Sequence, residues 1–215
     1  MEYYYKKNIK KIYFINNINA CEKNVNSLKN RLSHLGYKCC DLKVKCINDL
    51  EKKIEIEKEE EGNVMVFFYG YGYDRDTIFL GSNAQECITY ETLYRFLQQM
   101  LQGEEEALML FTTTWWKAKT TTTTTITSSY DSDDTLIENI FHLTTLVNGK
   151  SDNGCLMTEY LLNLDWGKET SCMKFSKLAQ QICVNVNRQK EWKDGKYYSY
   201  RIFLGTYDDV IVPKF

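Results

Sequence analysis

An unbroken apolar run, Val64 to Phe68, constrains the fold of this chain more than any other stretch. The run is too short for a helix of ordinary length and is rich in β-branched and aromatic residues, so it predicts a central strand buried on both faces. In open α/β sheets, ligands bind and chemistry occurs at the carboxyl ends of such strands. The segment that follows, Tyr69-Gly-Tyr-Gly-Tyr73, therefore stands where a functional site is expected.

Strands and helices alternate along the rest of the sequence. This alternation predicts one α/β domain with a largely parallel sheet. The polar, threonine-rich stretch 120–134 predicts a mobile loop, because it cannot bury apolar surface. The periodicity predicts helices over 20–35, from 48 or 49 onward, over 90–101, over 155–164 and over 173–186. Thr89 is the predicted N-cap of the helix over 90–101. Strands are predicted over 9–16, 37–44, 77–80, 107–111, within 136–147, and over 197–204 and 210–212.

The composition argues against several classes of function. Apolar residues make up 43% of the 215 residues, enough for a substantial core, and a net charge of −2 gives no indication of nucleic-acid or membrane-surface binding. No stretch approaches the roughly 18 apolar residues of a membrane span. The N-terminal stretch Met1 to Lys7 lacks the apolar segment of a signal peptide. We therefore expect a cytoplasmic protein.

The cysteines give little support for a metal site. They show neither a CxxC pair nor a matched histidine spacing, so we expect no metal and no cofactor. In a reducing cytosol we expect most of them to be small buried hydrophobic residues rather than a disulfide framework. The eight are Cys21, Cys39, Cys40, Cys46, Cys87, Cys155, Cys172 and Cys183.

Two predicted strands end in unusual sequences, Tyr69-Gly-Tyr-Gly-Tyr73 and Thr112-Thr-Thr-Trp-Trp116, about forty residues apart with a helix between them. This layout resembles the caspase-like cysteine peptidases, in which one strand ends in a Gly-His-Gly step and the next in a step that carries the nucleophilic cysteine. Gly70 to Tyr73, followed by Glu86-Cys-Ile88 and the helix to Met100, resembles the paracaspase branch most. The segments Tyr13–Asn17, Leu32–Lys38 and Phe175–Ala179 resemble the first strand, the first helix and a small-subunit helix of the family.

The resemblance covers about residues 9–212 and implies a fold and a division of the chain. The implied fold is a caspase-like three-layer α/β sandwich, with a mostly parallel sheet of about six strands and helices on both faces. The chain would be a single domain, 1–215. It would consist of a large-subunit-like part, 8–117, a flexible Thr/Ser/Asp loop, 118–135, and a small-subunit-like part, 136–213.

The departures from the family's pattern decide the expected activity. Tyr71 stands where the resemblance calls for the catalytic histidine, and Thr114 stands where it calls for the cysteine. Thr112 replaces the acidic residue that would recognise a basic substrate side chain. A tyrosine with a pKa near 10 is a poor base at neutral pH, and an internal threonine without a strong base is not a competent nucleophile. His34, His142 and Cys87 are not expected to rescue the chemistry.

Other interpretations of these residues stay open. An active peptidase could use residues that the pattern does not reveal, and Gly70-x-Gly72 could belong to a small-ligand or dinucleotide loop, although the third glycine is absent. The aromatic residues could line a groove for a peptide, or Trp115 and Trp116 could fill the former cleft. Candidates for the substrate cleft are Tyr69, Gly70, Gly72, Tyr73, Thr112, Trp115 and Trp116.

The leading expectation is a catalytically inactive scaffold or regulator. The resemblance implies a dimer through the last strand and its edge, for which 200–204 and 210–212 are the matching segments. The partner would be a second copy of the chain or an active relative. Neither nucleic acid nor a membrane is an expected partner.

Overall fold

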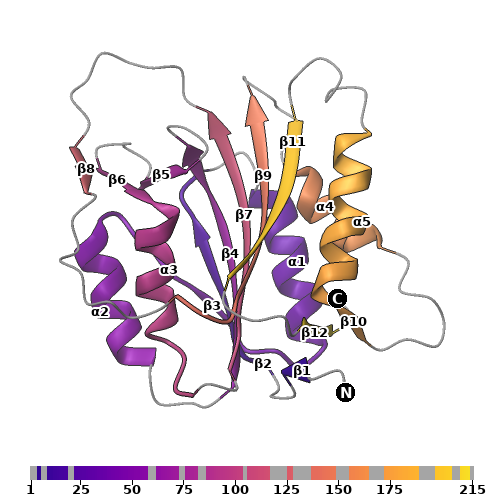
Figure 1. The fold of residues 1–215 in the computed structure, drawn as a ribbon, viewed down its shortest axis with the longest axis horizontal. Helices are drawn as coiled ribbons and strands as arrows, with labels where there is room; N and C mark the ends of the chain where they lie inside the picture. The colour runs from indigo at the N-terminus through magenta and orange to yellow at the C-terminus, as the bar shows by residue number, and fades with distance from the viewer. Residues whose placement is uncertain are drawn as a thin grey trace.

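The computed structural model describes thirteen stretches of the chain (Figure 1). They are residues 4–5, 9–18, 22–57, 62–72, 76–81, 86–103, 106–116, 125–127, 137–148, 155–164, 172–188, 197–204 and 209–213. Within them, no helix combines the length and the apolar character needed to cross a membrane.

The apolar run forms the centre of the sheet, as predicted. Strand β4 (Asn63–Gly72) lies between β2 (Ile9–Asn16) and β7 (Leu108–Trp116), and it is parallel to both. The sheet continues outward through β3 (Cys39–Asp41) on one side and through β9 (Ile140–Asn148) and β11 (Tyr197–Leu204) on the other. Only β11 runs antiparallel in this six-stranded order, β3-β2-β4-β7-β9-β11. The expected mostly parallel sheet is confirmed.

Three short strands extend the sheet beyond the carboxyl end of β4. Gly72 at that end pairs with Ile78 of β5 (Thr77–Leu80), and β5 pairs with β6 (Glu86–Thr89). Strand β8 (Thr125–Thr127) then pairs in parallel with β6. The expectation of a loop throughout 120–134 is therefore wrong for these three residues. β-branched threonine and isoleucine suit a paired strand. The rest of that stretch lies outside the described residues.

A second sheet, of three strands, contains the last described segment of the chain. Strand β12 (Asp209–Pro213) lies between β1 (Tyr4–Tyr5) and β10 (Cys172–Lys174). The segment 210–212, which the resemblance matched together with 200–204 to the last strand and its edge, is part of this separate sheet. Only β11 occupies that edge.

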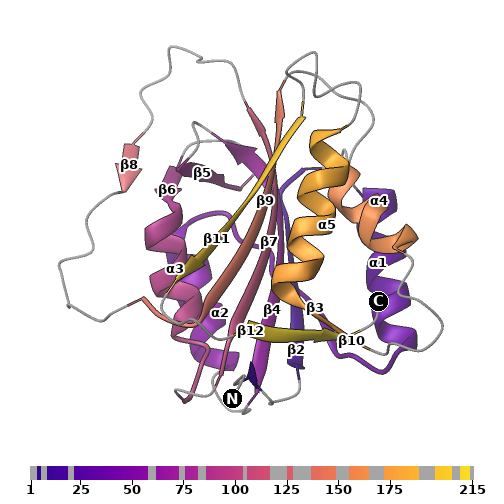
Figure 2. The ribbon, with the colours of Figure 1, turned by 45° about the vertical axis from the view of Figure 1, so that its right-hand side comes forward.

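The helices of the described residues cover the two faces of the main sheet (Figures 1 and 2). One face packs against α1 (Glu22–His34), α4 (Leu156–Asn163) and α5 (Phe175–Asn187), and the other against α2 (Ile47–Glu57) and α3 (Tyr90–Gln98). Alternate residues of β4 separate two cores, with Phe67 on the α1 side and Phe68 on the α3 side. This division follows from the two-residue period of a strand.

Local signals explain where the helices begin and end. Thr89 caps α3 as predicted, because its side chain accepts a hydrogen bond from the Thr92 amide at 3.1 Å. Gly36, with a φ of 90°, follows α1 in the left-handed conformation that suits glycine. The predicted strand 37–44 is shorter in the structure, where only Cys39–Asp41 is assigned to β3.

The expectation that most cysteines are buried is wrong for the part of the chain that the structure describes. Only Cys87 and Cys155 are buried there, whereas Cys172 is exposed and the other four are half-buried. Cys155, fully buried before α4, is disulfide-bonded. The six other cysteines of the described residues form no disulfide. Buried Cys87 of β6 is one of the six, and its exposed fraction is 0%.

Candidate functional site

The two unusual strand ends lie side by side in the sheet. In the parallel pair β4–β7, Gly70 is opposite Thr114 and Tyr71 is opposite Trp115. Strand β9 continues the same edge, with Leu146 opposite Thr114. The backbone positions that resemble the peptidase dyad are therefore neighbours across adjacent strands.

Their side chains nevertheless lie on opposite faces of the sheet. Tyr71 is half-buried and packs against the core on the α1, α4 and α5 side, where Trp115 also lies. Thr114 is one position out of register with Tyr71, so its side chain points to the face covered by α3. Thr112, two residues earlier on the same face of β7, has its hydroxyl 3.4 Å from the Tyr90 hydroxyl of α3, which agrees with this orientation. The two side chains do not face one another.

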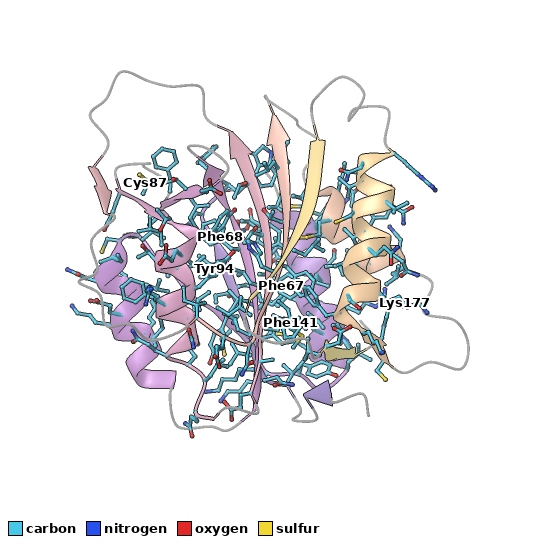
Figure 3. The ribbon with its side chains drawn as sticks, viewed as in Figure 1. Phe67, Phe68, Cys87, Tyr94, Phe141 and Lys177 are labelled. Atoms are coloured by element: carbon cyan, nitrogen blue, oxygen red, sulfur yellow. The ribbon has the colours of Figure 1, made fainter. Side chains whose placement is uncertain are left out.

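A buried polar cluster lies beneath α3 on the Thr114 face. His142 of β9 is at its centre, with Nδ1 2.6 Å from the Tyr94 hydroxyl and Nε2 2.8 Å from Thr112 Oγ1. The Tyr90 hydroxyl lies 3.4 Å from the hydroxyls of both Thr112 and Thr144. Figure 3 shows Tyr94 and Phe68 on this side of the sheet, while Phe141 lies on the other. We call His142, Tyr90, Tyr94, Thr112 and Thr144 the histidine cluster.

Burial determines the charge state of this cluster. It lowers the pKa of His142 to about 3, so the imidazole is neutral at pH 7. Burial also raises the pKa of Tyr90, and the nearby threonine hydroxyls offset part of that shift. Because a phenol is a stronger acid than an alcohol, we assign the Tyr94 hydroxyl as donor to His142 Nδ1. The ring then carries its proton on Nε2 and donates it to Thr112 Oγ1.

This proton arrangement does not activate Thr112. A threonine nucleophile needs a base that accepts its proton, whereas the assigned tautomer makes Thr112 Oγ1 the acceptor. A histidine with a pKa near 3 is also a very weak base at neutral pH. Both residues have an exposed fraction of 0%, so they do not contact solvent. The hydrogen bonds of the cluster join α3 to the sheet.

Unpaired polar atoms surround the end of β7. Thr113 Oγ1, Thr114 Oγ1 and Trp115 Nε1 are buried and make no hydrogen bond of acceptable geometry. On the α4 side, the Tyr69 hydroxyl hydrogen-bonds Thr158 Oγ1 at 2.8 Å. Burial raises the pKa of Tyr69, although that hydrogen bond opposes the shift, so the phenol stays protonated.

The structure places the predicted cleft residues as follows. Tyr69 and Thr112 are fully buried, Trp115 is 5% exposed within the α1-side core, and Gly70 and Gly72 are buried in β4. Trp116 ends β7, and Tyr73 lies outside the described residues. Among the side chains that the structure describes, no group of three or more histidine, cysteine, aspartate or glutamate residues could hold a metal ion.

Sequence reasoning did not identify the histidine cluster. The sequence pattern that indicates the cluster is a pair of threonines in each of two otherwise apolar strands. Thr112-Thr113 of β7 lie opposite Thr144-Thr145 of β9. Tyr90 and Tyr94, four residues apart, lie on one helix face above them. Only the register of β7 against β9 brings these signals together.

Comparison with solved structures identifies the fold. The chain superposes on the structure of pro-Sf-caspase-1 with a TM-score of 0.66, at 12% identity and over 97% of both chains. Caspase-1 from Spodoptera frugiperda matches with a TM-score of 0.56 at 13% identity, over 96% of this chain and 92% of that one. The structure of drICE matches with the same score and identity, over 97% and 94%.

The fold is caspase-like. At 12–13% identity the likeness concerns the caspase-like fold alone. No model of a protein family matches the chain, and no curated protein does either. The caspase-like fold is what brings the ends of β4 and β7 together, with a helix between the two strands in the sequence.

Proposed function

We propose that this chain is a catalytically inactive caspase-like domain, related most to the paracaspase branch, that acts as a scaffold or regulator. The observation that carries the proposal is the pair Tyr71 and Thr114. These residues occupy the dyad-like strand ends without an imidazole or a thiol, and they lie on opposite faces of the sheet. The parts 8–117 and 136–213 correspond in this proposal to the large-subunit-like and small-subunit-like parts.

The chemistry of cysteine peptidases supports the proposal. The nucleophile must be a thiolate formed beside a base that titrates near the working pH. Thr114 supplies a hydroxyl that is buried and has no hydrogen-bond partner of acceptable geometry. Only one histidine lies on the strands near it, His142, whose nitrogens are hydrogen-bonded to Tyr94 and Thr112.

Strand β11 supports a role in protein–protein interaction. All eight of its residues pair with β9 on one side, and within the described ranges no strand pairs with its outer edge. An unpaired edge of that length can accept a strand from another chain. The partner in this proposal is a second copy of the chain or an active relative with the same fold.

A peptidase assay tests the inactivity. The purified chain is incubated with fluorogenic peptides that carry basic or acidic residues before the reporter group, beside an active caspase as a positive control. We expect no hydrolysis above the buffer rate. Hydrolysis that Thr114→Ala or Tyr71→Phe abolishes would refute the inactive domain, whereas hydrolysis that only Thr112→Val abolishes would move the nucleophile to the histidine cluster.

Sedimentation at high micromolar concentration tests the interface. A dimer that Ile202→Pro dissociates would support pairing through β11, since proline cannot donate a strand hydrogen bond. A strictly monomeric chain, both alone and mixed with an active relative, would count against the scaffold role. A thermal-shift screen with nucleotides addresses the remaining alternative, a small-ligand module.

A further inference from the structure

We infer that the packing of α3 and of the Phe68 ring seals the nucleophile-like position, so that restoring cysteine and histidine would not restore a peptidase. This inference rests on the proposed function, because it takes Thr114 as the nucleophile-like position. It goes further because it attributes the lack of peptidase activity to the packing around the end of β7 as well as to the two substituted side chains.

The Phe68 ring forms one wall of the seal. It lies against Gly70, so closely that a Cβ on residue 70 would be 2.7 Å from Phe68 Cε1 and 2.8 Å from Cζ. Gly70 is the residue opposite Thr114 in the pair β4–β7. The ring is fully buried and belongs to the α3-side core. The space beside Thr114 that a glycine leaves open is therefore occupied by a phenyl ring.

Tyr90 forms the second wall. This residue begins α3, is 4% exposed, and has its hydroxyl 3.4 Å from those of Thr112 and Thr144, on the face of the sheet to which Thr114 also points. Its ring packs edge-on against His142, with centroids 4.9 Å apart. The Thr89 cap and the hydrogen bonds of Tyr90 and Tyr94 within the histidine cluster hold the start of α3 in place. Thr114 itself has an exposed fraction of 0%.

The sheet backbone also separates position 71 from position 114. A thiolate attacks a peptide carbonyl only when the reacting atoms approach to about 3–3.5 Å. A peptide cannot reach a side chain enclosed by Phe68 and Tyr90 unless α3 or its neighbours open. A histidine at position 71 would belong to the opposite face, with the backbones of β4 and β7 between its ring and a thiol at position 114. The imidazole could not form the thiolate there.

Thiol alkylation of a Thr114→Cys variant tests the seal directly. Iodoacetamide labelling is followed peptide by peptide with mass spectrometry, and the exposed native Cys172 is the internal reference. We expect Cys at position 114 to react at least about 100-fold more slowly than Cys172, because it reacts only through local opening. Adding Tyr90→Ala removes one wall and should accelerate the labelling about tenfold or more.

Phe96→Ala is the matched control for Tyr90→Ala. Phe96 is buried in the same core, six residues further along α3, about 9 Å along the helix axis. It tests whether any cavity under α3 accelerates labelling through general destabilisation. The inference would be overturned if the introduced cysteine of Thr114→Cys were labelled at a rate within a factor of ten of that of Cys172. It would also be overturned if Tyr90→Ala and Phe96→Ala accelerated the labelling equally.

The double variant Tyr71→His/Thr114→Cys completes the test. We expect no hydrolysis of the fluorogenic peptides, and any hydrolysis above the wild-type rate would overturn the inference. Activity of the wild-type chain bears on the proposed function alone, whereas slow or fast labelling bears on the seal alone. If the variants do not fold, amide hydrogen exchange of the wild-type chain replaces the labelling test. Exchange of the amides of residues 112–115 within seconds would overturn the inference, whereas exchange as slow as the slowest amides of the chain would support it.

Discussion

His142 Nε2 lies 2.8 Å from Thr112 Oγ1, and both side chains are completely buried between the sheet and α3. The two residues belong to adjacent parallel strands, where Leu110 rather than Thr112 is opposite His142. The hydrogen bond therefore runs diagonally between the two strands, on one face of the sheet. It joins the strand that carries Thr114 to the one that carries His142, and Tyr94 extends the connection to α3.

Two neighbouring threonines allow the contribution of this hydrogen bond to be measured. Thr112→Val leaves His142 Nε2 without its partner and should lower the free energy of unfolding by about 1–3 kcal/mol. Thr113→Val makes the same chemical change one residue away, but the Thr113 hydroxyl has no partner. That substitution should be neutral or stabilising. Urea denaturation of both variants gives the comparison, and an equal loss in both would contradict the role of the cluster.

The stability of the fold should fall in acid because of His142. Its pKa is about 3 in the folded chain, compared with an ordinary value near 6.5 when unfolded. Below pH 6.5 the unfolded state therefore binds a proton that the folded state does not bind until pH 3. The stabilisation is fully present above pH 6.5 and is lost as the pH falls from 6.5 towards 3, by roughly 2–3 kcal/mol at pH 4.5.

The variant His142→Gln isolates this contribution from that of the carboxyl groups. Urea denaturation at pH 7.0, 5.5 and 4.5 gives the pH dependence for both chains. The variant should start from a lower stability and lose less of it between pH 7.0 and 4.5 than the wild type. If the stabilities of the wild type and the variant fall by the same amount between pH 7.0 and 4.5, His142 is charged in the folded chain. The assignment of a buried, neutral imidazole would then be wrong.

Gly70 should tolerate no side chain, because Phe68 occupies the space. Gly70→Ala places a methyl group 2.7 Å from the Phe68 ring and should cost about 1–3 kcal/mol, as overpacking of a core does. Gly103→Ala is the control, because a Cβ there meets nothing within 4 Å. Thermal unfolding should separate the two variants clearly. A Gly70→Ala chain as stable as Gly103→Ala would show that the Phe68 ring is not fixed against the strand.

The connection between α4 and the sheet should depend on Tyr69. Tyr69→Phe removes the hydroxyl that hydrogen-bonds Thr158 at 2.8 Å and leaves the Thr158 hydroxyl buried. We expect a loss of about 1–2 kcal/mol in the free energy of unfolding. The double variant Tyr69→Phe/Thr158→Val removes both polar atoms and should recover part of that loss. A double variant less stable than the sum of the two single changes would contradict the pairing.

The sequence predicted the parts of the fold that short-range patterns determine. The run Val64 to Phe68 identified the central strand, Thr89 identified the start of α3, and the strand–helix alternation predicted the parallel sheet. The caspase-like fold, which the resemblance implied, is confirmed by the structural comparison.

The parts that depend on register and long-range pairing were not predictable in this way. A shift of one residue moves a side chain to the other face, so the separation of Tyr71 from Thr114 appears only when the β4–β7 pairing is known. Segment 210–212 reads as strand material, but its pairing with β1 and β10 joins three distant stretches. The disulfide of Cys155 likewise has no local spacing that reveals it.

The most direct test of the central claim is peptide hydrolysis by the wild-type chain beside its Thr114→Ala variant. Both are assayed at micromolar concentration against fluorogenic peptides with basic and acidic residues, with an active caspase as positive control. The inactive-domain account predicts the same background rate for both chains. Hydrolysis by the wild type that is lost in Thr114→Ala would contradict it.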